Sequence, residues 1–313
     1  MEFAKSREEM GKSLAEGFVS TWDVAAEYEV ADGVLRRTDW RGGFENPLPW
    51  DRQYRPGAYP QLVAEFARLN VNEPAQLISF AKTWGALGFL EQILSLPVVL
   101  PGETEKQIEY LKAVGGDPLS WIAAHVQGVN VCLRLIDCLL RRDYREIESY
   151  LKAFRPTLSF VEAGLEPSTD ISILYGRRYQ TVSSWFSAPD PESYNPPYSE
   201  QEQSFMLAKN VIEGIVNDNL RGGIAPALKH GWETGFGELF EFVSLMDVIY
   251  WHLMRIATSK VGLAKCQECG QYFIQTHGRQ RFCPPEDWEG EQAESRCARR
   301  YRARKARKKK RGG

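Results

Sequence analysis

Four cysteines near the C-terminal end of the 313-residue chain have the spacing of a metal site. Cys266 and Cys269 form a Cys-x-x-Cys turn that is followed by Gly270, and Cys283 and Cys297 each follow after thirteen intervening residues. Four thiolates complete the tetrahedral shell that Zn²⁺ prefers, and a shell closed by protein ligands leaves no position open for catalysis. The spacing therefore predicts a structural zinc site at these four cysteines.

Two other interpretations of this segment are open. His277 could replace Cys297 as the fourth ligand, because Zn²⁺ accepts nitrogen as well as sulphur. A Cys-x-x-Cys pair can also exchange thiols and disulfides, but that activity is typical of a thioredoxin-like βαβ context, which the flanking sequence lacks. Zinc binding is the favoured interpretation, with either residue as the fourth ligand.

A basic segment begins at the last cysteine. Residues 296–311 contain eleven Lys and Arg and no Asp or Glu. Arg and Ala favour helices, so Cys297 should lie in the first turn of a helix about 24 Å long. Such a helix binds phosphates favourably because each neutralised phosphate releases counterions. We expect nucleic-acid contacts from all eleven: Arg296, Arg299, Arg300, Arg302, Arg304, Lys305, Arg307, Lys308, Lys309, Lys310 and Arg311.

The charge of the chain is divided along its length. The formal net charge is −2, but residues 260–313 contain 15 Lys and Arg against 6 Asp and Glu, whereas the first 259 residues contain 24 against 35. An acidic body with a basic end indicates a polyanionic partner. The acidic insert between Cys283 and Cys297 is expected to be a solvated loop, or to fold onto the basic helix; its acidic residues are Glu286, Asp287, Glu289, Glu291 and Glu294.

The segment over residues 266–311, about 15% of the chain, resembles the CGNR-type zinc fingers of bacterial proteins and related short C-terminal fingers. Where these fingers have the Cys-Gly-Asn-Arg motif that gives them their name, the chain has Cys297-Ala298-Arg299-Arg300. The acidic insert also widens the gap between the last two cysteines. The resemblance implies zinc binding and DNA-binding transcription regulation. The matching residues are Cys266, Cys269, Phe273, Arg281, Cys283, Cys297 and Arg300.

The sequence before the cysteines predicts a mainly helical structure. The chain contains 43% hydrophobic residues, enough for a buried core, which excludes a wholly disordered protein. Apolar residues recur at helical spacing after Pro60, after Pro74 and after Pro118, and proline is typical of a first helical turn.

Further elements follow along the chain. A short apolar pattern ends before Pro156, and Ser199-x-x-Glu202 is a capping box that opens another helix. Residues 157–187 are rich in β-branched and aromatic types and predict a small sheet or β-hairpin. The longest apolar face, over residues 236–257, predicts a helix that leads into the cysteines.

Two domains are expected from these patterns. Residues 1–261 should form a mainly α regulatory or partner-binding body with a minor β element. Residues 262–313 should form a small four-cysteine zinc finger, treble-clef or ribbon-like, with a basic C-terminal helix.

Sequence motifs of several enzyme classes are missing from the chain. There is no Walker loop, GxGxxG, GxSxG or HExxH. His125 and His252 lie within apolar helical patterns and are expected to be core residues, and Cys132 and Cys138 are expected to be buried free thiols. An enzyme is therefore the less favoured interpretation.

The expected location is the cytoplasm. The N-terminus is charged and lacks the apolar run of a signal peptide, and residues 236–257 hold too many charges to span a bilayer. Cytosolic thiols stay reduced, so clustered cysteines indicate metal before disulfide.

The functional prediction is a zinc-binding, DNA-binding bacterial regulator. Its body would respond to a small-molecule or protein effector, or would form a homo-oligomer. Two alternatives are open: an RNA- or protein-interaction module that uses the basic segment, and a nucleic-acid-directed enzyme with its active site in the body.

Overall fold

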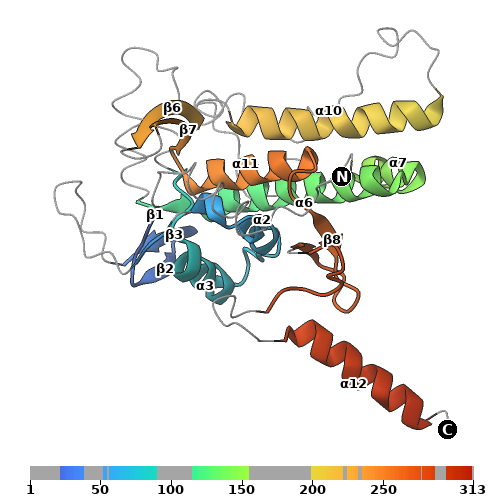
Figure 1. The fold of residues 1–313 in the computed structure, drawn as a ribbon. Coiled ribbons are helices and arrows are strands. Elements are labelled where there is room, and N and C mark those ends of the chain that lie inside the picture. The colour runs from blue at the N-terminus through green and yellow to red at the C-terminus, as the bar shows by residue number, and fades with distance from the viewer. Residues whose placement is uncertain are drawn as a thin grey trace. The chain divides into compact units, whose positions relative to one another are not determined.

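The computed structural model describes residues 22–38, 52–54, 56–89, 115–154, 199–220, 224–231, 235–275, 277–285 and 294–311. The chain divides into two compact units, Met1–Met254 and Arg255–Gly313. Most residues of the described elements belong to helices, and the strands are short and form small sheets of two or three strands (Figure 1). The prediction of a mainly helical protein with minor β structure is confirmed.

Two small sheets open the first unit. Strand β1 (Trp22–Val24) pairs antiparallel with β4 (Arg52–Tyr54). Strands β2 (Tyr28–Ala31) and β3 (Val34–Arg37) form a hairpin, and the short β5 (Asp117–Pro118) adds to β3. The hairpin turn is the dipeptide Asp32-Gly33 with positive φ at both residues, as a two-residue turn of type I′ requires.

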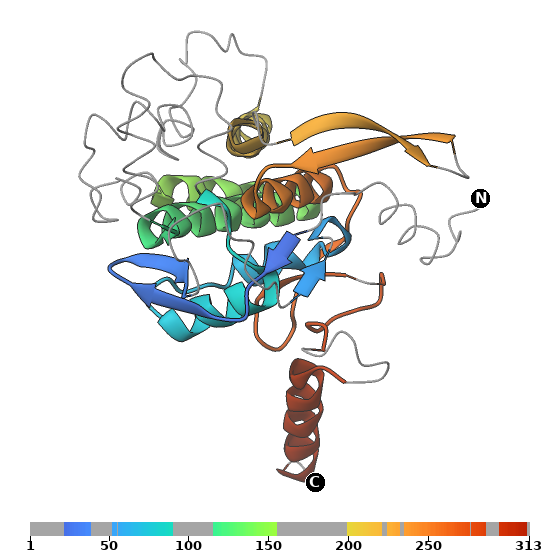
Figure 2. The same cartoon turned by 90° about the vertical axis from the view of Figure 1, so that its left-hand side faces the viewer.

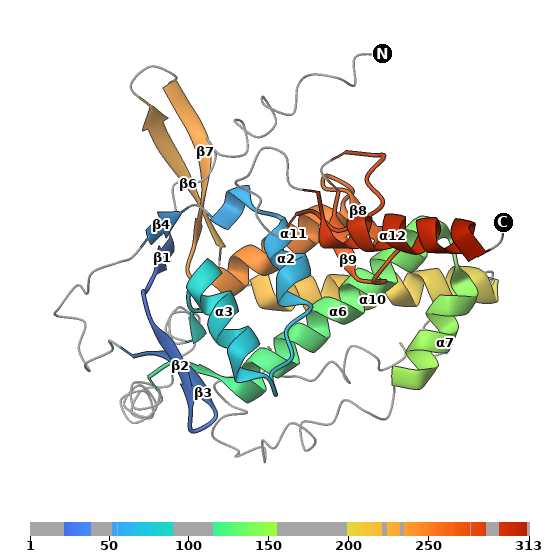
Figure 3. The same ribbon diagram turned by 90° about the horizontal axis from the view of Figure 1, so that it is seen from below.

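Helices form most of the described part of the first unit. After the 3-10 turn η1 (Pro56–Ala58), the helices predicted after Pro60, Pro74, Pro118 and Ser199 begin where they are expected. Helix α3 packs against the strands β1 and β2 (Figure 3). The bounds are α2 (Gln61–Phe66), α3 (Pro74–Trp84), α6 (Leu119–Arg141), α7 (Tyr144–Phe154), α10 (Glu200–Leu220) and α11 (Leu245–Ala257).

Three of these helices meet at one glycine. A Cβ atom added to Gly128 of α6 would lie 3.4 Å from Tyr250 Oη of α11 and 3.8 Å from a methyl group of Ile215 on α10. Figure 2 shows α11 beside α6, with α10 seen nearly end-on next to them. These are ordinary van der Waals distances, so a methyl group would fit at Gly128, whereas a larger side chain would meet both neighbours.

The segment after α3 connects distant elements of the core. The buried Asp117 carboxylate accepts hydrogen bonds from the backbone N–H groups of Leu87 (2.7 Å) and Phe89 (2.9 Å). Met246 N donates to the carbonyl oxygen of Leu87 (3.1 Å), which ties the same segment to α11. Gly88 supplies the positive φ of +84° that turns the chain between the two donors.

The predicted helix over residues 236–257 is wrong in its first third. Residues Gly235–Phe242 form β7, which pairs antiparallel with β6 (Ile224–Gly231), and α11 begins only at Leu245. Gly235 and Gly237 lower helix propensity, whereas phenylalanines at alternate positions favour a strand. The spacing of the apolar residues alone did not distinguish a strand from a helix over residues 236–242.

Some sequence-based predictions concern residues that the structure does not describe. The small sheet or hairpin expected over residues 157–187 lies entirely outside the described residues. Of the acidic residues in the insert, only Glu294 is among the described residues.

Helix α6 is the core helix of the first unit. Within the described residues it is the one helix long and apolar enough, by length and composition, to cross a membrane, and 56% of that 18-residue window is buried inside the structure. Core helices of soluble proteins meet the same criterion, so length and composition do not distinguish the two roles.

The expected core cysteines and histidines are buried. Cys132 and Cys138 are free thiols with no exposed surface, and burial raises the pKa of both, that of Cys138 to about 11. His125 Nδ1 is hydrogen-bonded to Tyr250 Oη (2.8 Å), and His252 Nε2 to a backbone oxygen (3.2 Å). These predictions are confirmed.

Candidate metal centre and basic helix

A short hairpin in the second unit positions the first two cysteines. Strand β8 (Leu263–Lys265) pairs antiparallel with β9 (Tyr272–Ile274), and Cys266 follows β8 directly. The N–H of Gly270 donates to the carbonyl of Cys266 (2.9 Å), which closes a tight turn. Gly270 has a φ of +73°, a conformation that residues with a side chain rarely adopt. The turn therefore directs Cys266 and Cys269 toward one point.

The third cysteine, Cys283, lies in the loop that follows β9. The N–H of Gln267, inside the turn, donates to the carbonyl of Arg281 (3.1 Å), so the loop lies against the turn two residues before Cys283. Phe273 and Ile274 of β9 are buried. The backbone hydrogen bond therefore positions the loop that carries Cys283.

The fourth cysteine lies in the first turn of helix α12 (Arg296–Arg311), as predicted. Ser295 caps this helix: its Oγ accepts from the N–H of Ala298 (3.1 Å), and its carbonyl accepts from the N–H of Arg299 (3.1 Å). Serine is a preferred N-cap residue because its oxygen satisfies an otherwise unpaired amide. The cap fixes where the helix begins, and so fixes the place of Cys297.

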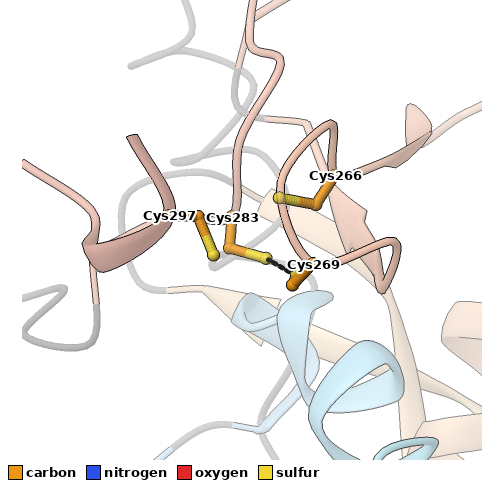
Figure 4. A group of neighbouring side chains, drawn as sticks. All are labelled: Cys266, Cys269, Cys283 and Cys297. Atoms are coloured by element: carbon orange, nitrogen blue, oxygen red, sulfur yellow. Dashed lines mark hydrogen bonds between the residues drawn. The ribbon is translucent and has the colours of Figure 1, made fainter. Parts of the chain in front are cut away.

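The four sulphur atoms form one cluster. The Sγ atoms of Cys266, Cys269, Cys283 and Cys297 all lie within 4.8 Å of one another, and their side chains converge (Figure 4). Zinc–sulphur bonds of 2.3 Å in a tetrahedron separate the sulphurs by about 3.8 Å. The 3.5 Å between the Sγ atoms of Cys269 and Cys283 is close to that value and far from the roughly 2 Å of a disulfide. The cluster could bind a metal ion.

His277 is not part of this cluster. Its side chain is exposed, and the group that could hold a metal ion, within the part of the chain that the structure describes, has Cys297 as its fourth member. Of the two ligand sets left open by the sequence, the structure brings together the one with four cysteines.

The surroundings of the thiols favour a negative charge within the cluster. Burial opposes ionisation of Cys266, but the backbone N–H groups of Cys269, Glu268 and Cys283 outweigh it and lower the pKa of this thiol to about 6. Burial, together with hydrogen bonds to the sulphurs of Cys269 and Cys266, raises the pKa of Cys297 to about 11. Backbone amides that point at a thiolate are typical of a turn that binds a cation.

Helix α12 is fastened to the rest of the second unit along one face. The ring of Tyr301 packs on that of Phe282, with 5.1 Å between centroids. The guanidinium of Arg304 lies 2.8 Å from the carboxylate of Glu268, inside the Cys-x-x-Cys turn. Together with Cys297, these residues fix the first two turns of α12 in the same unit as the cluster.

The predicted nucleic-acid contacts all lie on α12, and those whose side chains the structure describes are exposed. Arg302 pairs with Glu294 of the acidic insert, and Arg304 pairs with Glu268. Lys308, Lys309, Lys310 and Arg311 continue the helix. The described and exposed side chains are those of Arg296, Arg299, Arg300, Arg302, Arg304, Lys305 and Arg307.

Sequence reasoning missed the residues that position the helix. Ser295 had a recognisable signal, because serine directly before a run of helix formers is typical of an N-cap. Glu268, Phe282 and Tyr301 had none, since their partners lie far away in sequence and only the folded unit brings them together.

No protein-family model matches the chain, and neither the curated proteins nor the solved structures yield a match.

Proposed function

We propose that the cysteine cluster binds one Zn²⁺ as a structural ion, in a finger similar to the CGNR type. Four convergent sulphur ligands suit zinc or an iron–sulphur centre, and a set filled by protein ligands is typical of structural zinc. Elemental analysis of the purified protein is expected to find one zinc per chain and no iron. Iron with acid-labile sulphide would contradict this assignment.

We further propose that α12 binds nucleic acid, with DNA as the favoured polymer. The observation that supports this is the attachment of the basic helix: its first turn holds the fourth cysteine, and its exposed arginines therefore have a fixed direction. A solubilising tail would need neither the cap at Ser295 nor the contacts of Tyr301 and Arg304. Fixed positive charges pay less ordering entropy on binding than a disordered run of the same composition.

The protein as a whole is proposed to be a cytoplasmic bacterial regulator. In this proposal residues 1–261 receive a signal, through an effector or through self-association, and the C-terminal module contacts DNA. The support is the division of charge between an acidic body and a basic end.

The test is a titration of zinc-loaded, full-length protein against duplex DNA and RNA at several salt concentrations. A variant truncated after Arg304 is the matched control, because it keeps the cysteines, Tyr301 and the Glu268 contact while losing six basic residues. We expect a log–log salt slope of about −5 for the full chain on DNA, which corresponds to five or six phosphates. The truncated chain should bind more weakly and with a shallower slope.

Other outcomes would redirect the proposal. Failure of the full-length protein to bind either polymer near physiological salt would remove the nucleic-acid function, and an acidic protein partner of α12 would become the leading candidate. Hydrolysis of nucleic acid that persists after the truncation would instead favour an active site in the body.

A further inference from the structure

The contacts of α12 determine which of its faces points away from the cysteine cluster. Cys297, Tyr301 and Arg304 follow one another at intervals of four and three residues, so they form one stripe along the helix. All three contact the same unit, through the sulphur cluster, the Phe282 ring and Glu268 respectively. This stripe is the attached face, and the rotation of the helix about its axis is thereby fixed.

The opposite face has small residues at its centre. At 100° per residue, four residues lie about 180° to 240° around the helix from Cys297: Arg299, Ala303, Ala306 and Lys310. They follow one another at intervals of four, three and four residues, and Arg299, Ala303 and Ala306 are exposed. A purely electrostatic segment would gain from a basic residue at every exposed position, yet the two alanines lie in the middle of this face.

Basic side chains border this face on both sides. Arg296, Arg300 and Arg307 lie on one flank, between the alanine stripe and the attached face. Arg302 and Lys305 lie on the other flank. The ion pair of Arg302 with Glu294 is at the surface, with 69% of the Arg302 side chain exposed, and such pairs contribute little stability. Phosphate can therefore compete for Arg302.

A small-residue stripe between two basic flanks is complementary to a groove lined by two phosphate backbones. An α-helix with its side chains is about 10–12 Å across, and the major groove of B-DNA is about 12 Å wide. Short side chains toward the floor let the helix enter deeply, while arginines on both flanks reach the two strands. The major groove of A-form RNA is too narrow and deep for this arrangement.

We propose that α12 lies in the major groove of duplex DNA, with Ala303 and Ala306 toward the groove floor and the flanking arginines on the phosphates of both strands. This deepens the proposed function and rests on it: the helix must first bind nucleic acid. The proposal adds the polymer, the groove and the face of the helix that enters it.

The test replaces both alanines by leucine in the full-length, zinc-loaded protein. Leucine is a good helix former, so A303L/A306L keeps the helix, the charge and the attached face. Bulk added at a closely packed interface is expected to weaken binding to duplex DNA about tenfold. The matched control A303S/A306S keeps the residues small and should bind DNA like the unsubstituted protein.

Heparin serves as the second ligand because it is a polyanion without a groove. Its affinity for A303L/A306L is expected to equal that for the unsubstituted protein, and zinc content and far-UV circular dichroism should be the same in all three proteins. Equal DNA affinity of the leucine variant and the parent would overturn the groove placement while leaving the nucleic-acid function intact. A parent that prefers duplex RNA would also overturn it. A parent that binds none of these polyanions would overturn the proposed function itself.

Discussion

Single buried polar side chains join separate segments in the core of the first unit. Asp117 is 2% exposed and accepts two backbone N–H groups on either side of Gly88, and the ring of His125 joins the hydroxyl of Tyr250 between two helices. A buried polar group that keeps its partner is nearly neutral, whereas one that loses it is costly. The sensitivity of this core to substitution should therefore be greatest at such residues.

Asp117→Asn tests this expectation. The amide keeps one acceptor oxygen, so one of the N–H groups of Leu87 and Phe89 loses its partner in the interior. We expect a destabilisation of about 1–3 kcal/mol. Urea unfolding measures it, and Asp32→Asn, in the exposed hairpin turn where asparagine tolerates positive φ, should cost almost nothing. Equal effects of the two substitutions would contradict the argument.

The buried carboxyl group of Glu65 should make the stability of the first unit depend on pH. Burial raises the pKa of this carboxyl, although a hydrogen bond from Trp84 Nε1 (2.7 Å) and the charge of Arg68 oppose the shift. The folded state thus binds the proton more tightly than the unfolded state. The contribution of Glu65 to stability is complete at pH below the unfolded pKa and is lost as pH rises through the folded pKa.

Glu65→Gln is therefore expected to raise the melting temperature at pH 7, because glutamine removes the buried charge and can still accept from Trp84. The gain should shrink as the pH falls through the folded pKa and should be gone below about 4, where the carboxyl is neutral in both the folded and the unfolded state. Glu65→Leu removes the acceptor as well and should cost about 1–3 kcal/mol. A melting temperature for Glu65→Gln below that of the parent at pH 7 would show that the charge is stabilising.

At the scale of elements, two helices begin with the same capping arrangement in different surroundings. In the box at α10, Ser199 and Glu202 are exposed, whereas in the box at α11 Ser244 and Asp247 are completely buried. Ser244→Ala is expected to cost about 2 kcal/mol and Ser199→Ala about 0.5 kcal/mol, since water replaces the cap only at the exposed site. Thermal unfolding of both variants measures the difference. Equal costs would show that burial does not strengthen the cap.

Local signals explain which elements the sequence could predict. Helices that begin at Pro74 or after Ser199 depend on capping and periodicity within a few residues, and these were predicted correctly. The strands β1 and β4 have three residues each, and Trp22 pairs with Tyr54 across a long stretch of chain. No local pattern encodes such a partner, so the pairing appears only in the folded protein.

The candidate metal site divides in the same way. The spacing of the cysteines predicted the four ligands that the structure brings together, with His277 as the alternative to Cys297. The turn from Cys266 to Cys269 and its glycine were the clearest part of this pattern, because they are local. The fourth ligand depended on where α12 begins, which the cap at Ser295 decides. The contact of Arg304 with Glu268 joins two segments that are far apart in the sequence. From the sequence, Arg304 was therefore predicted only as a nucleic-acid contact and not as a residue that positions α12.

At the scale of the whole molecule, the two units differ in what stabilises them. The first unit buries large side chains from many elements, among them Trp84, Trp121 and Phe66. The second unit has short strands and one largely exposed helix, and its buried side chains beyond α11 include Phe273 and Ile274. A unit of this size with so small a core needs a metal or a disulfide to fold.

Removal of a metal ligand should therefore unfold one unit and spare the other. Structural zinc contributes roughly 10–16 kcal/mol in small fingers, which exceeds what this core supplies. Cys269→Ser is expected to lose the metal and the amide protection from hydrogen exchange in β8, β9 and α12, while α6 and α11 up to Met254 stay protected. Hydrogen exchange with mass spectrometry, beside elemental analysis, measures both.

Cys138→Ala is the matched control, because it removes a buried thiol from α6 that lies outside the sulphur cluster. It should lower the stability of the first unit by about 1–2 kcal/mol and leave the metal content unchanged. A chelator added to the parent protein should reproduce the exchange pattern of Cys269→Ser. Protection of β8 and β9 that survives both treatments would mean that the small apolar core around Phe273 is sufficient, and the cluster would then have to be explained by a role other than stability.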